Sequence, residues 1–70
     1  MKPASGSIGG QVQAARIKRG YSQSELARVL SVDPSFISLI ERDKRDPSLA
    51  TLRRIVDILG GQMTIQLWVD

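Results

Sequence analysis

The stretch SQSELARVLSVDPSFISLIERD, residues 22–43, contains two helix-start signals separated by a very short turn. Ser22 begins the sequence SQSE, in which the serine hydroxyl can accept a hydrogen bond from a helical amide while Glu25 reaches back, the arrangement called a capping box. Asp33 offers a second cap, and Pro34 follows at the first helical position, where its missing N–H is no loss. The stretch therefore predicts two short helices, at about residues 23–30 and 34–42.

A helix is predicted on each side of this pair. On the N-terminal side, apolar positions recur at helical spacing until Gly20, a residue type that commonly ends helices. On the C-terminal side, Ser48 can cap a helix in which the same spacing continues as far as the double glycine at 60–61. The apolar residues expected to face the core are Ile8, Val12, Ala15 and Ile17 in the first helix, together with the aliphatic stem of Arg16, and Leu49, Leu52, Ile55, Val56 and Leu59 in the last.

The chain changes character at both ends. Residues 1–7, MKPASGS, are rich in Gly, Ser and Pro and have little to bury, so they are predicted to form a disordered arm. Near the other end, MTIQLWV alternates with a period of two, which predicts a strand within residues 61–70. A lone strand leaves its backbone groups unpaired, so we expect it to pair with the strand of a second copy. The residues predicted for this dimerisation strand are Met63, Ile65, Leu67, Trp68 and Val69.

Composition limits the classes of function. The 70 residues form one domain at most and carry a net charge of +3, which favours anionic partners. There are no cysteines and no histidines, so disulfides, thiolate metal sites and cysteine nucleophiles are excluded. The carboxylates are scattered and no nucleophile stands beside a base, so we expect no enzyme, no metal site and no cofactor. No apolar run suits a membrane span or a secretory signal, and a cytoplasmic location is predicted.

The two central helices have the residue spacing of a helix-turn-helix. Ala27 is small at the point where the two helices would cross closely. Continued by IERDKRDPSLATLRRIVDILG, this spacing resembles the Cro/CI-like repressor family, also called the XRE family, over residues 12–60. The resemblance implies a mainly α fold, in which a four-helix DNA-binding domain at residues 8–60 precedes a strand that pairs across a homodimer. The residues expected on the inner faces of the central helices are Leu26, Ala27, Leu30, Ile37 and Ile40.

In that family the second helix of the pair lies in the major groove of DNA, and the resemblance implies the same place for residues 33–42. The hydroxyl groups of Ser35 and Ser38 would hydrogen-bond to bases or phosphates, and Leu39 would contact thymine methyl groups. Phe36 has two interpretations of equal weight, an apolar contact with DNA or packing against the start of the preceding helix or the dimer partner. The predicted DNA-binding residues are Gln23, Ser24, Asp33, Pro34, Ser35, Phe36, Ser38, Leu39, Arg42, Lys44 and Arg45.

The basic residues Arg42, Lys44 and Arg45 come directly after this helix, where family members meet the sugar-phosphate backbone. A charge run is usually only a solvated face, but its position beside the recognition helix favours phosphate binding. The resemblance also implies that Gln23 contacts a phosphate and braces the recognition helix. The alternative for Gln23 is an ordinary exposed glutamine at a helix start.

Three residues receive structural assignments. Arg16 and Glu41 match family positions that form a partly buried ion pair, so removing either one alone would strand a charge. Ser31 occupies a turn position that is usually glycine in the family. A serine there either adopts a left-handed conformation, at a cost of about 1 kcal/mol, or avoids it.

The predicted strand points to one group within the Cro/CI-like family. HipB-like antitoxins of toxin–antitoxin modules also follow the last helix with a short strand that pairs across the dimer. This resemblance implies a repressor that binds a palindromic operator in double-stranded DNA, autoregulates its operon and holds a toxin, in such systems often a HipA-like kinase. A phage-type or metabolic regulator without a toxin, and a helix-turn-helix module that binds only protein, are the alternatives.

Overall fold

A computed structural model of the protein describes residues 7–61. Within that range the chain forms four helices, α1 (Ile8–Lys18), α2 (Gln23–Leu30), α3 (Pro34–Glu41) and α4 (Leu49–Leu59). The mainly α fold with a central helix-turn-helix is therefore confirmed. The predicted dimerisation residues Met63, Ile65, Leu67, Trp68 and Val69 lie outside the described residues, as do the first six positions of the predicted arm.

The starts of α2 and α3 follow from their capping residues. The amide of Glu25 donates to the Ser22 hydroxyl at 3.0 Å, and the Ser22 amide donates to the Glu25 carboxylate at 2.8 Å, so both halves of the capping box are present. Asp33 accepts a hydrogen bond from the Ser35 amide at 2.8 Å, with Pro34 at the first helical position. Local side chains therefore set where both central helices begin.

The outer helices are capped in the same way. The hydroxyl of Ser48 accepts a hydrogen bond from the Thr51 amide at 3.1 Å at the start of α4. Ser7 accepts one from the Gly10 amide at 2.9 Å at the start of α1. Ser7 was predicted to be the last residue of the arm, and in the structure it is the N-cap of the first helix.

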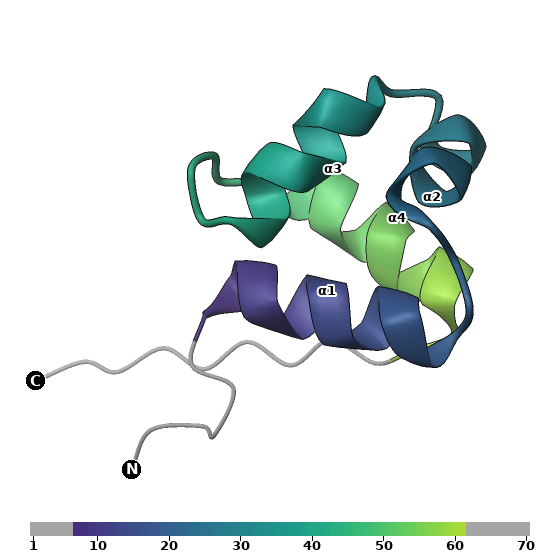
Figure 1. Ribbon diagram of the computed structural model, residues 1–70. Helices are drawn as coiled ribbons and strands as arrows, with labels where there is room; N and C mark the ends of the chain where they lie inside the picture. Colours follow the sequence, from purple (N-terminus) through teal and green to yellow (C-terminus); the bar gives the residue numbers. More distant parts are fainter. Residues whose placement is uncertain (1–6, 62–70) are drawn as a thin grey trace, which may run out of the picture.

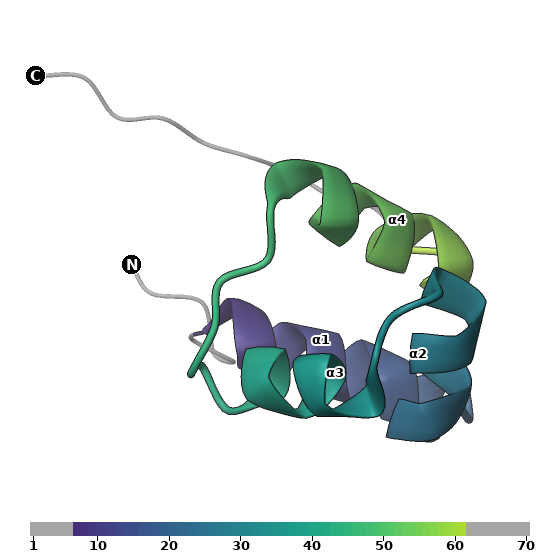
Figure 2. The same ribbon diagram turned by 90° about the horizontal axis from the view of Figure 1, so that it is seen from above.

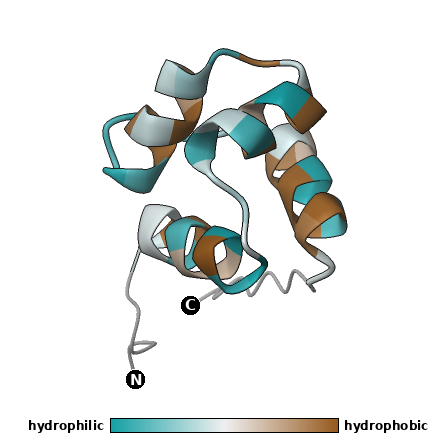
Figure 3. Cartoon of the chain, turned by 45° about the vertical axis from the view of Figure 1, so that its right-hand side comes forward, coloured by the Kyte–Doolittle hydropathy of each residue, from teal (hydrophilic) through white to brown (hydrophobic). Residues whose placement is uncertain are grey.

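Figure 1 shows α1 running beneath α3, with α2 at one side and α4 behind. Seen from above in Figure 2, α3 overlies α1 while α4 lies along the far side. Helix α3 packs on both α1 and α2, and α4 closes the core from the other side through contacts with the same two helices. The apolar faces turn inward in Figure 3. The fully buried core consists of Val12, Leu26, Ala27, Leu30, Ile37, Ile40, Ile55 and Leu59.

The predicted inner face of α1 is partly wrong. Val12 is buried, but Ile8 is 50% exposed and Ile17 is 61% exposed. Arg16 faces inward as predicted, and Glu41 receives its side chain. Gly9, which was not predicted, also faces inward, because α3 lies close to the helix backbone. In α4, likewise, Leu49 keeps the helical spacing but lies in the first turn and is 56% exposed.

The turn between α2 and α3 is tight because Ser31 adopts the left-handed conformation, with φ of 60°. The Val32 amide then donates to the Ala27 carbonyl at 2.9 Å. A side chain of α4 also supports this turn, since the Arg54 guanidinium donates to the Leu30 carbonyl at 3.2 Å. These bonds satisfy carbonyls that the end of a helix would otherwise leave unpaired.

None of the helices in residues 7–61 is both long enough and apolar enough to cross a membrane.

Candidate nucleic-acid interface

The outward face of α3 takes no part in core packing over much of its length. Ile37, Ile40 and Glu41 point inward and are buried, whereas Ser35 is exposed and both Ser38 and Leu39 are half-buried. Two hydroxyls and one apolar side chain therefore lie along one side of a short helix. Such groups can hydrogen-bond to base edges and touch thymine methyl groups in a major groove.

The first residues of α3 stabilise the helix itself. The Asp33 carboxylate accepts the Ser35 amide, and this hydrogen bond lowers the pKa of Asp33 below its usual range. An ionised carboxylate at the helix start interacts favourably with the helix dipole but would repel a nearby phosphate. Asp33 and Pro34 are exposed, and their geometry accounts for them as helix-start residues.

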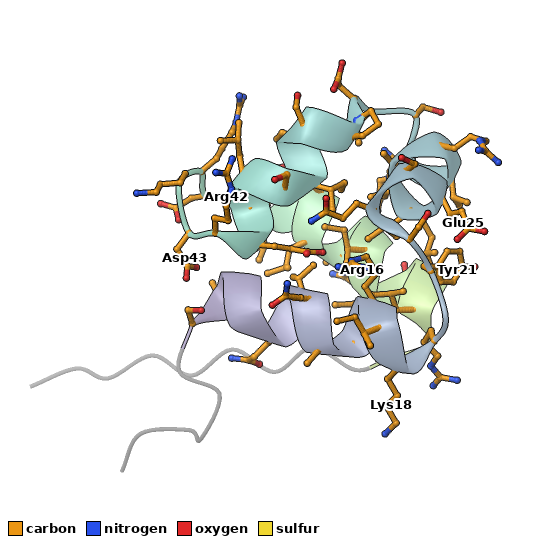
Figure 4. All side chains as sticks on the ribbon, viewed as in Figure 1. Arg16, Lys18, Tyr21, Glu25, Arg42 and Asp43 are labelled. Carbon is orange, nitrogen blue, oxygen red and sulfur yellow. The ribbon has the colours of Figure 1, made fainter. Side chains whose placement is uncertain are left out.

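Arg16 and Glu41 form the ion pair that the family resemblance implied. Arg16 Nε donates to Glu41 Oε2 at 2.6 Å and Nη2 donates to Oε1 at 3.0 Å, with side-chain exposures of 11% and 1%. A third donor, Nη1, reaches the Tyr21 carbonyl at 2.9 Å, a partner that sequence reasoning missed. The bond to Glu41 raises the pKa of Arg16, so the guanidinium keeps its positive charge. Figure 4 shows Arg16 lying between α1 and the helices above it.

Gln23 joins the same cluster from the first position of α2. Its side-chain amide donates to Glu41 Oε1 at 3.0 Å, so the end of α3 is held by residues of both α1 and α2. This is the bracing contact that the resemblance implied for Gln23. A carboxamide nitrogen has two N–H groups, so one remains for another acceptor. Ser24, the next residue, is exposed in the first turn of α2.

A basic loop, defined here as residues 42–45, follows α3. Arg42, Lys44 and Arg45 are all exposed, and Arg42 Nε lies 3.4 Å from the Ser38 carbonyl. The Arg45 guanidinium carbon lies 5.0 Å from the centre of the Phe36 ring, a cation–π arrangement. Phe36 itself is half-buried and packs against the core, which favours the packing interpretation of this residue. Its ring serves as a platform for Arg45.

Gly9 supports the basic loop and was not predicted from the sequence. Its amide donates to the Asp43 carboxylate at 3.2 Å, and a methyl group on its α-carbon would overlap the Ile40 carbonyl oxygen. Figure 4 shows the Asp43 side chain pointing from the basic loop toward the first turn of α1. The available signal was a glycine inside a helical pattern, which costs about 1 kcal/mol relative to alanine and so suggests a close backbone approach.

Taken together, these contacts place a polar face and a cationic loop side by side on a rigid support. The cationic side chains can neutralise phosphates without regard to sequence, and the polar face can discriminate between base edges.

Comparison with known proteins relates the chain to transcriptional regulators. Residues 12–65 match the family profile described as Helix-turn-helix (HTH_3). The HTH-type transcriptional regulator RamB of Mycobacterium tuberculosis (strain H37Rv) is 39% identical over 57 residues, which are 81% of this chain but 12% of that protein. The immunity repressor protein of Bacillus phage phi105 is 35% identical over 57 residues, 81% of this chain and 40% of the repressor. The chain thus spans only a part of these two relatives.

Other similar proteins match over most of their length. The uncharacterized HTH-type transcriptional regulator YazB of Bacillus subtilis (strain 168) is 35% identical over 52 residues, 74% of this chain and 75% of that one. Among solved structures, the crystal structure of the master regulator for biofilm formation SinR in complex with DNA superposes with a TM-score of 0.73 at 36% identity. That match covers 79% of this chain and 89% of the SinR chain.

Proposed function

Because the chain belongs to the XRE-type helix-turn-helix family, whose profile it matches over residues 12–65, we propose that it is a sequence-specific DNA-binding transcriptional regulator. One structural observation carries the proposal. The inward side of α3 is locked into the core and the Glu41 cluster, while its outward side presents Ser35, Ser38 and Leu39 next to the basic loop.

In the proposed binding mode, α3 enters the major groove of double-stranded DNA. Ser35 and Ser38 contact base edges, and Leu39 covers thymine methyl groups. The basic loop contacts the sugar-phosphate backbone at the end of the same helix, and the second N–H of Gln23 reaches a phosphate from the start of α2. SinR, a protein of the same fold and 36% identity, was crystallised in complex with DNA, which supports this mode.

The outward face of α3 offers no arginine or glutamine, the side chains that make the strongest bidentate contacts with guanine and adenine. Specificity in the proposed complex therefore depends on methyl contacts, hydroxyl contacts and the shape of the DNA. If the shape of the DNA is recognised, the selected duplexes should show a preference at base pairs that the protein does not contact, and this preference should follow the width of the groove there.

Repression is the finer form of the proposal, supported by the similarity to the phage phi105 immunity repressor. A regulator without a toxin partner also fits the names of RamB and YazB. The antitoxin prediction, with its homodimer and HipA-like toxin, depends on the strand outside the described residues and stays a prediction. Capture of a toxin by the full chain from its native lysate would be the observation in its favour.

The proposal is tested by selecting duplexes from a randomised library with the full chain and then measuring affinity against salt concentration. If a dimer neutralises on the order of 8 phosphates, log K should fall with log salt at a slope of about −7. A monomer would give about half that slope. A slope near zero, with no sequence enriched, would reject DNA binding and leave the protein-binding module as the explanation of the fold.

A further inference from the structure

Asp43, the second residue of the basic loop, attaches the loop to α1 through a hydrogen bond. Asp43 adopts the left-handed conformation, with φ of 58°, and its Oδ1 accepts the Gly9 amide at 3.2 Å. Gly9 lies in the first turn of α1, where backbone amides have no partner within the helix. The Ser7 hydroxyl caps one of these amides, that of Gly10, and the Asp43 carboxylate caps another from 34 residues away.

The approach that allows this bond is very close. Gly9 is buried, and a side chain there would collide with the Ile40 carbonyl at the end of α3. The loop then bends back, because the Asp43 amide donates to the Ile40 carbonyl at 3.0 Å and the Lys44 amide donates to the Leu39 carbonyl at 2.9 Å. The left-handed residue that makes this bend is therefore fixed both to α3 and to α1.

Asp43 is also the acidic residue in the middle of the basic loop, between Arg42 and Lys44. Its carboxylate is bonded to the start of α1, and Figure 4 shows the Asp43 side chain pointing toward that helix. At the far end of the loop, Arg45 is held against Phe36. The loop is thus anchored at both ends, and Lys44 lies between the two anchors.

We propose that Asp43 is a positioning residue for phosphate binding: its bond to Gly9 fixes the loop that presents Lys44 and Arg45 to the DNA backbone. This inference rests on the proposed DNA-binding function. A free loop would lose conformational entropy when it met the phosphates, whereas an anchored loop has lost that entropy on folding. Asp43 touches no phosphate in this account and acts through its neighbours.

Two substitutions separate the hydrogen bond from the charge. Asp43→Asn keeps an acceptor oxygen at the same place and tolerates the left-handed conformation. Asp43→Gly removes the acceptor but accommodates the same φ without strain. Both variants lack the negative charge beside the phosphates, so a difference between them does not come from electrostatic repulsion. It reports the loss of the anchor, to which the greater backbone freedom of glycine adds.

The measurement is the affinity of each full-length variant for a labelled duplex that the wild-type chain has selected. Loss of a hydrogen bond of ordinary strength corresponds to about fivefold in affinity, so Asp43→Gly should bind about fivefold more weakly than Asp43→Asn. Asp43→Asn should bind at least as tightly as the wild type, because it retains the bond and removes a like charge. Because the same bond caps α1, its loss should also lower the thermal midpoint of Asp43→Gly by about 4 to 8 °C relative to Asp43→Asn. Affinities are therefore compared at a temperature at which both variants are fully folded, where a merely structural role would leave them equal.

Amide hydrogen exchange at Gly9 provides a second readout that needs no DNA. The Gly9 amide should exchange slowly in the wild type and in Asp43→Asn, and faster in Asp43→Gly. Equal affinities of the two variants for a duplex that the wild type binds would overturn the inference and leave the proposed function standing. Failure of the wild type to bind any duplex would overturn the proposed function and this inference together, so the two failures are distinguishable.

Discussion

Glu41 at the end of α3 accepts two hydrogen bonds from Arg16 of α1, at 2.6 and 3.0 Å, inside a domain whose buried apolar side chains come from all four helices of residues 7–61. The orientation of α3 in this small core therefore depends on a buried charge pair as well as on apolar packing. DNA-binding experiments on variants are therefore informative only when the Arg16–Glu41 contact is intact.

Removing one member of the pair should be strongly destabilising. Arg16→Met leaves the Glu41 carboxylate buried with Gln23 as its remaining side-chain partner, and we expect a loss of about 3 to 5 kcal/mol in the free energy of unfolding. Denaturant titration followed by circular dichroism measures it. The control is the double variant Arg16→Met, Glu41→Leu, which should recover most of the loss. A double variant no more stable than the single one would contradict the stranded-charge explanation.

The stability of the fold should decrease at acid pH, because the carboxylates that cap α2 and α3 become protonated. A hydrogen bond from the Ser22 backbone amide lowers the pKa of Glu25 below its ordinary value of 4.5, and the Ser35 amide lowers that of Asp33 below 3.8. A depressed folded-state pKa gives stability that is present above the unfolded pKa and is lost as pH falls through the folded value. We therefore expect the thermal midpoint to be flat above about pH 5 and to decrease below about pH 4.

Glu25→Gln is the matched variant for this pH dependence. It keeps a side chain that can still accept the Ser22 amide but does not titrate. Its thermal midpoint should decrease less steeply in acid than that of the wild type. An identical acid profile in both proteins would assign the pH dependence to other carboxylates.

Base reading and phosphate binding should separate by mutation. Ser35→Ala and Leu39→Ala change the outward face of α3, so they should alter the sequences recovered in selection, by no more than the roughly 1 to 3 kcal/mol that a mismatched base pair costs. Lys44→Ala should weaken all sequences alike and make the salt slope less negative by about one. The assignment fails if Lys44→Ala changes the preference while the α3 variants leave it unchanged.

Phe36→Leu should act through Arg45. Leucine retains apolar packing against the core but offers no ring face, and a cation–π contact at an exposed site contributes about 0.5 to 1 kcal/mol. This energy corresponds to a two- to fivefold change in affinity, and we expect a loss of about that size for every duplex tested. Combining Phe36→Leu with Arg45→Ala should add little beyond Arg45→Ala alone. A changed sequence preference would instead revive direct contact of Phe36 with DNA.

A chain ending at Gly61 tests the predicted dimerisation strand. The described fold should survive, because Gly60 adopts the left-handed cap at the end of α4 and the Gly61 amide still donates to the Val56 carbonyl at 3.0 Å. If the strand makes the dimer, the shortened chain should sediment as a monomer and keep its helical circular dichroism. It should lose most of its affinity for a palindromic operator, whose half-sites lie about 34 Å apart. Unchanged sedimentation and binding would assign the last residues another role.

The parts of the fold that the sequence predicted are those in which cause and effect lie within one helical turn. Ser22 and Glu25 are three residues apart, and Asp33 caps an amide two residues away, so both helix starts were predictable. The inner face of α1 was predictable only in part, because Gly9 faces inward where α3 approaches its backbone and where Asp43, 34 residues away, accepts its amide. Periodicity identifies an apolar stripe but cannot show that a neighbouring helix needs bare backbone or a cation at that position.

The candidate site divides in the same way. The basic loop was predictable as a charge run, whereas its attachment to α1 joins residues 34 positions apart. The family resemblance supplied the Arg16–Glu41 pair, which spacing alone would not have predicted. Phe36 is the middle case, since composition permitted either interpretation and only the position of Arg45 and the core favours packing.

The cap at the start of α3 has an evolutionary consequence. Ser35 gives that cap only its backbone amide, a group that every residue except proline possesses, and its own side chain is exposed. Exchange at this position can therefore change which duplex is preferred with almost no change in folding free energy. A regulator built this way can follow a drifting operator by single substitutions, and descendants of one ancestor can come to read different genes while the scaffold beneath the recognition helix stays the same.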